Sequence, residues 1–165
     1  MGRGMAWLAS LALLGVLYLF FDGSLQARNN PNRALQIAPG AELVLQRSRD
    51  GHYVFPGEIN GRPVSFLLDT GATLVSVPAH LAVGLGLVAG AQQQSVTANG
   101  TVLTRATQIG VLAFGPFKLS DVRASINPGM RDDQVLLGMS VLKQLEFTQR
   151  GDTLVLRPMG NEKEF

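Results

Sequence analysis

The amino-acid sequence predicts a mostly β domain made of hairpins, with one or two short helices. Its 165 residues include 19 glycines and 8 prolines, while 46% of all residues are apolar. That composition is typical of a turn-rich folded domain and not of a disordered chain. Apolar and alternating runs end at Asp50-Gly51, Asn60-Gly61 and Asn99-Gly100, which are the dipeptides of tight hairpin turns. The chain length is sufficient for one domain.

The elements follow from these runs and turns. The predicted strands cover residues 42–47, 52–59, 62–68, 94–98, 101–109, 117–126, 146–149 and 153–157. The first three are joined by two tight turns and lead directly to Asp69, and the last two pair across Arg150-Gly151-Asp152. Helical stretches are expected at residues 139–145 and at residues 78–85, where Gly84 and Gly86 keep the helix short.

The amino terminus is predicted to be a membrane anchor covering residues 1–26. Residues 6–21 are apolar apart from Ser10, aromatic residues lie near both ends of this run, and Arg3 precedes it. These features favour a membrane span. A cleaved signal peptide is the main alternative, although Leu25-Gln26-Ala27 fits a cleavage site poorly; a buried core helix is another. Residues 27–40, with two prolines, are expected to be a linker, and residues 159–165 a polar tail.

Composition excludes several kinds of site. The chain has no cysteine, so disulfides, cysteine-based zinc sites and thiol nucleophiles are excluded. Its 14 basic residues are scattered and the net charge is +2, which gives no electrostatic footprint for nucleic-acid binding. His52 and His80 lack partners at the spacing of metal ligands. We therefore expect neither a metal nor a cofactor.

The strongest chemical signal is Asp69, where an apolar strand ends in Asp69-Thr70-Gly71. A glycine at this position would let the backbone turn sharply and hold the carboxylate at the floor of a cleft. Two carboxylates about 3 Å apart share one proton, so that one acts as general base on a water and the other donates to a substrate carbonyl. The chain has a single Asp-Thr-Gly, so the second carboxylate is expected from Asp69 of another copy in a two-fold homodimer.

Three motifs together resemble the retropepsin-like aspartic proteases, above all their bacterial membrane-associated members. They are Asp69-Thr70-Gly71-Ala72 after an apolar strand, Asn99-Gly100 about 30 residues later, and Val135-Leu136-Leu137-Gly138 before a short helix. The resemblance covers residues 42–158. It implies a closed β-barrel with one lobe per chain in residues 41–158. It also implies an endopeptidase that cleaves polypeptides without a cofactor.

The same resemblance assigns roles to individual residues. Asp69 would be catalytic, and Gly71 and Ala72 would complete its loop. The hydroxyl of Thr70 would brace the two loops across the dimer axis, and Thr73 would hydrogen-bond the carboxylate. The resemblance also implies a flap over the substrate, formed by Ala98, Asn99 and Gly100. It further implies an apolar-glycine motif that supports the site, formed by Leu136, Leu137 and Gly138.

Some alternatives stay open at this point. Asn99-Gly100 is also an ordinary turn signal. The polar carboxy-terminal tail differs from the interleaved termini of retroviral members, so the mode of dimerisation is open. A non-catalytic peptide-binding or assembly module with the same β fold is the rival function. With the anchor, the expected location is the inner membrane as a single-pass protein, with the catalytic domain in the periplasm.

Overall fold

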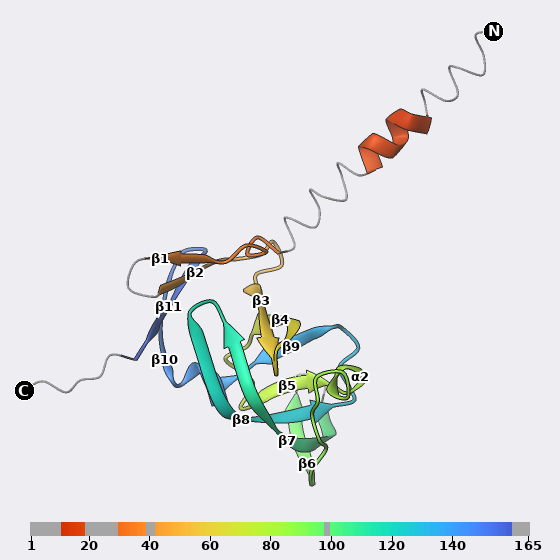
Figure 1. Ribbon diagram of the computed structural model, residues 1–165, viewed down its shortest axis with the longest axis vertical. Helices are drawn as coiled ribbons and strands as arrows, with labels where there is room; N and C mark the ends of the chain where they lie inside the picture. Colours follow the sequence, from red (N-terminus) through yellow and green to blue (C-terminus); the bar gives the residue numbers. More distant parts are fainter. Residues whose placement is uncertain (1–10, 19–29, 39–41, 98–99, 160–165) are drawn as a thin grey trace, which may run out of the picture.

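The protein is described here by a computed structural model that covers residues 11–18, 30–38, 42–97 and 100–159 (Figure 1). The domain is mostly β with short helices, as predicted. Its strands are β1 Gln36–Ala38, β2 Glu42–Gln46, β3 Val54–Ile59, β4 Arg62–Leu68, β5 Val75–Pro78, β6 Gln92–Thr97, β7 Gly100–Phe114, β8 Phe117–Asn127, β9 Gln134–Leu137, β10 Leu145–Arg150 and β11 Thr153–Pro158. Two short helices, α2 Ala79–Ala82 and α3 Met139–Leu142, lie between strands.

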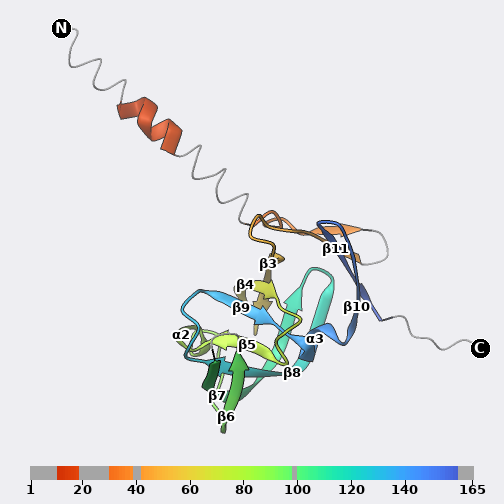
Figure 2. The ribbon, with the colours of Figure 1, turned by 180° about the vertical axis from the view of Figure 1, so that it is seen from behind.

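Most strands belong to a seven-stranded sheet with the order β3-β4-β9-β5-β8-β7-β6. Two of its pairings are parallel, β4 with β9 and β5 with β8. The strand β3 also pairs with β7, through Glu58 opposite Ala113 and Ile59 opposite Leu112. Seen from behind, β4, β9 and β5 lie side by side, with α3 close to the end of β9 (Figure 2). The parallel pairing brings the carboxyl ends of β4 and β9 to the same edge.

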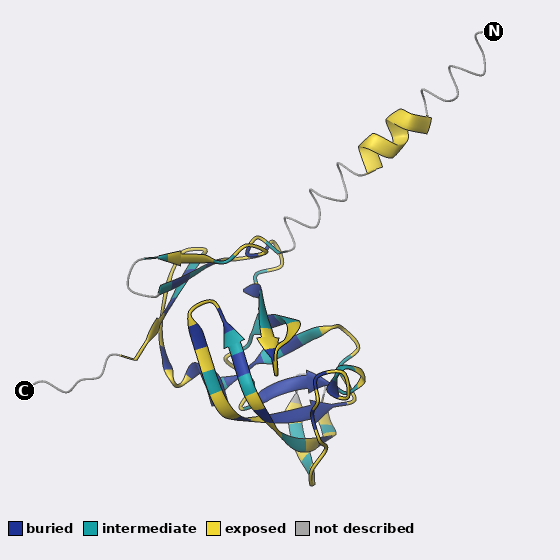
Figure 3. Ribbon diagram, in the orientation of Figure 1, coloured by how far each residue is buried: buried dark blue, intermediate teal, exposed yellow. Residues whose placement is uncertain are grey.

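Four phenylalanine rings pack against one another in the core of this sheet. Phe55, Phe66, Phe114 and Phe117 are buried, and the centroids of neighbouring rings are 5.2 to 6.0 Å apart. Tilted and edge-on ring pairs at such distances add about 0.5 to 1.5 kcal/mol each beyond the burial of apolar area. Buried positions form a continuous interior around β5 and β8 (Figure 3). These rings therefore tie β3, β4 and the β7–β8 hairpin together.

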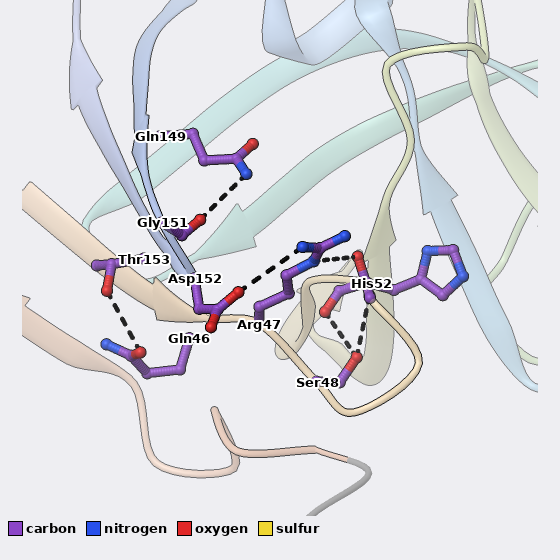
Figure 4. Close-up of polar contacts among 9 residues, drawn as sticks. Gln46, Arg47, Ser48, His52, Gln149, Gly151, Asp152 and Thr153 are labelled. Atoms are coloured by element: carbon purple, nitrogen blue, oxygen red, sulfur yellow. Dashed lines mark hydrogen bonds and ion pairs between the residues drawn. The ribbon is translucent and has the colours of Figure 1, made fainter.

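A second, four-stranded sheet has the order β1-β2-β11-β10. The prediction that residues 42–47 and 52–59 form a hairpin across Asp50-Gly51 is wrong, because β2 pairs with β1 and β11 instead. The turn itself exists, since the Ser48 amide donates to the His52 carbonyl at 2.7 Å. Arg47 donates to the Gly51 carbonyl at 2.9 Å and lies 3.7 Å from the Asp152 carboxylate (Figure 4). The turn therefore sends the chain from one sheet to the other.

Several element boundaries differ from those predicted. The helix expected at residues 139–145 ends at Leu142, because Leu145 already begins β10. The helix expected at residues 78–85 is α2, and Pro78 instead ends the unpredicted strand β5. The strand expected from residue 52 begins at Val54. The other hairpins are confirmed, including β3–β4, β6–β7 and β10–β11.

The amino-terminal predictions fall partly outside the described residues. Residues 11–18 are helical, whereas residues 1–10 and 19–29 are not described. Across the part of the chain that the structure covers, we find no helix both long and apolar enough to cross a membrane. Part of the expected linker belongs to the fold, since β1 pairs with β2. The buried side chain of Asn32 also donates to the carbonyls of Gln46 and Val54, both at 2.9 Å.

Candidate active site

Asp69 lies immediately after β4, where two parallel strands end together. Its amide donates to the Leu137 carbonyl at 3.1 Å, which extends the pairing of β4 with β9 by one residue. The residue is half-buried. The main chain that carries the carboxylate is thus hydrogen-bonded to β9 as far as Asp69 itself.

The loop after Asp69 orients the carboxylate through main-chain donors. The Gly71 amide donates to Asp69 Oδ1 at 2.8 Å, and the Ala72 amide donates to the Asp69 carbonyl at 3.3 Å. The chain turns here as expected, but Gly71 does not have a positive φ, so the turn does not require the conformational freedom of glycine. A Cβ there would lie 3.2 Å from Oδ1, which is a tight contact. A glycine at position 71 therefore leaves space for the Asp69 carboxylate next to the Gly71 amide.

The loop is anchored from below by α3. The Ala72 and Thr73 carbonyls accept from the amides of Met139 and Ser140 at 2.8 and 2.9 Å. The Ser140 hydroxyl in turn accepts from the buried Val75 amide at 3.1 Å. These carbonyls thus satisfy amides in the first turn of a helix, which have no partner within the helix itself. Loop and helix therefore hold each other in place.

Gly138 is the residue that allows this contact. A Cβ at this position would lie 2.3 Å from the Leu74 carbonyl oxygen and 2.6 Å from the Ala72 carbonyl oxygen. Its backbone is extended, with φ −93°, so glycine is needed here for space and not for conformation. The apolar part of the motif has a matching role, because Leu137 is fully buried and Leu136 lines the cavity at Asp69. The motif Leu136-Leu137-Gly138 is thus a close-packing device beneath the Asp69 loop.

A cavity of about 740 Å³ opens above Asp69. One wall is the strand β6, and the others come from the Asp69 loop and from β5, β8 and β9. Its lining residues are Asp69, Gly71, Ala72, Thr73, Leu74, Ser76, Gln93, Gln94, Ser95, Val96, Ser125, Asn127 and Leu136. Asp69 is the only acidic or basic side chain among them. The described lining of the cavity therefore combines one charged group with uncharged polar residues and apolar residues.

The expected flap corresponds to the β6–β7 hairpin. Thr97 pairs with Gly100, and Gly100 has φ 107°, which favours glycine. Ala98 and Asn99, the expected tip, lie outside the described residues. Because β6 lines the cavity, this hairpin borders the space above Asp69.

Two further residues of the loop are exposed. Thr70 and Thr73 both face solvent in the single chain. The hydrogen bonds of the described residues include none between the Thr73 side chain and Asp69; the Gly71 amide occupies the carboxylate instead. The exposed Thr70 directly follows Asp69.

Other polar residues noted in the sequence lie elsewhere. His80 contacts Asp133 at 2.8 Å, and both line a separate, mainly apolar cavity of about 600 Å³. Asp132 lies in an exposed loop away from Asp69. Within the described ranges no three His, Asp or Glu side chains gather as metal ligands.

Among the cavity residues that sequence reasoning missed are three polar ones, Ser76, Ser125 and Asn127. They come from β5 and β8, and all three are buried. Polar residues alternating with apolar ones in Val75-Ser76-Val77 and Ala124-Ser125-Ile126-Asn127 could have revealed them.

Comparison with known proteins agrees with this geometry. The family model for the gag-polyprotein putative aspartyl protease matches residues 55–144, which include Asp69, the β6–β7 hairpin and Gly138. An uncharacterized protein in the cobV 5′ region of a Sinorhizobium species is 31% identical over 164 residues. That alignment covers 92% of this chain and 70% of the relative.

Two solved structures are similar to the chain to different extents. The crystal structure of a retropepsin-like aspartic protease from Rickettsia conorii has a TM-score of 0.56 and 25% identity, covering 70% of this chain and 88% of that one. The EIAV protease complexed with the inhibitor HBY-793 has a TM-score of 0.46 and 20% identity. It covers 58% of this chain and 88% of the other.

Proposed function

The chain belongs to the retropepsin-like aspartic protease family, and from that premise we propose that it is an aspartic endopeptidase active as a homodimer. One observation carries the proposal. Among the described residues that line its cavity, Asp69 is the only charged one, and its carboxylate is oriented by the Gly71 amide at 2.8 Å. In a family of aspartic proteases, a lone, oriented carboxylate at the floor of a cavity would supply half of a two-carboxylate site.

The second half would be Asp69 of another copy. A two-fold axis beside the exposed Thr70 would bring the two carboxylates together, since the same surface of each chain then meets itself. Two carboxylates in contact hold one proton between them. The pairing of β3 with β7 supports a closed barrel, in which each chain supplies one rigid lobe.

The chemistry needs only these two groups and a water. The ionised carboxylate takes a proton from the water, and the resulting oxygen nucleophile attacks the peptide carbonyl carbon. The protonated carboxyl donates its proton to the carbonyl oxygen. The tetrahedral diol then collapses: the C–N bond breaks, one hydroxyl returns its proton to the carboxylate that had donated one, and the leaving nitrogen receives a proton from the carboxyl that first accepted one. An extended peptide would lie beneath the β6–β7 hairpin.

The test uses the full chain and a library of synthetic peptides. We expect wild type to cleave part of the library and Asp69→Asn to lose at least about 1,000-fold in kcat/KM, because the general base is removed. Asp132→Asn is the matched control, since it makes the same change on an exposed loop and should leave cleavage unchanged. Equal cleavage by wild type and Asp69→Asn would refute the proposal, and peptide binding without turnover would favour the non-catalytic module.

Mixing the two chains tests the shared site. If wild type and Asp69→Asn exchange subunits at equal amounts, about one quarter of the dimers keep both carboxylates. Activity per wild-type chain should therefore fall to about half that of wild type alone. Activity that stays proportional to the amount of wild-type chain would show that one carboxylate is sufficient.

We also propose that residues 1–26 tether the enzyme to the inner membrane, with the domain on the periplasmic side. The apolar run at residues 6–21 supports this. Membrane fractions should retain the full chain after a high-salt wash and release a chain that starts at residue 30. Full-length protein found only in the soluble fraction would contradict the tether.

A further inference from the structure

Three buried polar side chains share the cavity of Asp69. Ser76, Ser125 and Asn127 are only 8%, 5% and 7% exposed, yet all of them line that cavity. Two more strands thus contribute to the site besides those that carry the aspartate motif.

Strand alternation explains how they come to lie together. Side chains one residue apart on a strand point to opposite faces. On β5 the neighbours of Ser76 are Val75 and Val77, both buried in the core. Ser76 therefore faces away from the core and toward the cavity. Together with its equivalents on β8, it gives the two strands an apolar face inside and a polar face on the cavity.

The same alternation holds on β8. There Ala124 and Ile126 belong to the core cluster, while Ser125 and Asn127 line the cavity. The parallel register places Ser125 beside Ser76. The three polar side chains therefore form one continuous wall, named here the β5–β8 wall, which consists of Ser76, Ser125 and Asn127.

The hydrogen bonds of the wall leave defined groups available. Asn127 Oδ1 accepts from the Gly129 amide at 2.8 Å, which directs the Nδ2 amide group elsewhere. No described residue accepts from that amide or bonds the Ser125 hydroxyl. The Ser76 hydroxyl donates to Met130 Sδ at 3.3 Å, so its oxygen remains an acceptor. The wall thus offers one amide donor, one free hydroxyl and one acceptor.

We propose that the β5–β8 wall is a specificity subsite for an asparagine or glutamine side chain of the substrate, close to the cleaved bond. This inference rests on the proposed peptidase function. A carboxamide oxygen can accept from Asn127 Nδ2, while its NH₂ group donates to the oxygens of Ser76 and Ser125. An apolar side chain would cover these groups without bonding them, which costs free energy.

Charged side chains are disfavoured for a different reason. Apart from Asp69 itself, no acidic or basic group lines the cavity among the described residues. An ionised side chain placed against the wall would lose water, and the wall itself supplies no counter-charge. The subsite therefore selects for polarity without charge.

The test measures side-chain preference at each position around the bond that the full-length protein cleaves in a synthetic peptide library. We expect wild type to prefer Asn or Gln over Leu at one position. Ser125→Ala should lower kcat/KM for those peptides about 3- to 10-fold, the usual effect of losing one hydrogen bond, and leave Ala-containing peptides unchanged. Ser120→Ala, on an exposed part of the same strand, should change nothing.

Asn127→Asp provides a sharper variant, since its carboxylate keeps an acceptor for the Gly129 amide but loses the Nδ2 donor. It should shift the preference from Asn and Gln toward Lys and Arg. A wild-type profile with an apolar preference at every position near the bond would overturn the proposal. So would an Asn127→Asp profile identical to that of wild type.

Failure of the subsite can be told apart from failure of the peptidase function. The same peptides can be tested for binding to the Asp69→Asn variant, with displacement of a fluorescent peptide as the readout. This measurement needs no turnover. Enrichment of Asn and Gln among bound peptides, without any cleavage by wild type, would retain the subsite and refute the peptidase. Cleavage by wild type without such enrichment would refute the subsite and retain the peptidase function.

Discussion

Substituting Gly138 by alanine should separate close packing from backbone conformation at the base of the site. The added Cβ would lie 2.3 Å from the Leu74 carbonyl oxygen and 2.6 Å from that of Ala72. Both neighbours are main-chain atoms, so no side chain can rotate away. Because φ at Gly138 is −93°, alanine is not strained by the backbone conformation itself, and the whole effect is steric.

The size of the effect follows from the bonds that the movement would disturb. Relieving the clash requires a shift of about 1 Å between the loop and α3, since ordinary contacts of this kind exceed about 3.3 Å. The amides of Met139 and Ser140 would then lose their bonds of 2.8 and 2.9 Å to the loop. Two lost main-chain bonds and the strained packing together give a loss of about 3 to 5 kcal/mol in the free energy of unfolding.

Urea denaturation of the full chain, monitored by circular dichroism, measures that loss in the free energy of unfolding. Gly84→Ala is the matched control, because a Cβ there meets only the Leu81 carbonyl at 3.4 Å and should change stability by less than about 1 kcal/mol. Peptide cleavage should fall as well, since the carboxylate of Asp69 sits on the displaced loop. A loss below about 1 kcal/mol for Gly138→Ala would refute the steric argument.

Two other changes test what the fold buries. The hydroxyl of Tyr53 is buried and has no hydrogen-bond partner among the described residues, so Tyr53→Phe should leave the free energy of unfolding at pH 7 unchanged or raise it by up to about 1 kcal/mol. Burial raises the pKa of Tyr53. The contribution of Tyr53 to wild-type stability is therefore constant below pH about 10, and stability falls as the pH rises through the raised pKa. The advantage of Tyr53→Phe should widen there, and urea titrations at pH 7 and pH 10.5 that give the same difference would contradict this. Asn32→Ala removes two donors to main-chain carbonyls and the 2.6 Å bond from the Gln46 amide, and should cost about 2 to 3 kcal/mol. Gln36→Ala, on exposed β1, is its control, and equal stability of the two variants would show that Asn32 does not hold the amino-terminal segment to the domain.

Local patterns were sufficient wherever a feature depends on residues close in sequence. The hairpins at Asn60-Gly61 and around residues 98–99 were predicted because a turn and its flanking strands are adjacent in the chain. The candidate catalytic position was predicted for the same reason, since Asp69 directly follows an apolar strand. The prediction of a hairpin at Asp50-Gly51 was wrong. The turn exists, but a turn signal does not say which strand pairs with β2.

Features that depend on distant segments needed the tertiary structure. The partner of β2 is β11, more than 100 residues later, and a choice between equally alternating strands is decided by packing against the core. The role of Gly138 emerged only when its contact with Leu74 was known.

The sequence by itself determined that Asp69 follows a strand, that a glycine follows closely and that the chain has a single Asp-Thr-Gly. These are local facts, written in a few consecutive residues. Only the tertiary structure decided what surrounds that carboxylate, because β5 and β8 are separate in the chain and meet through a parallel pairing. A long-range pairing of this kind is what places Ser76 beside Ser125 and turns isolated polar residues into a wall of the cavity.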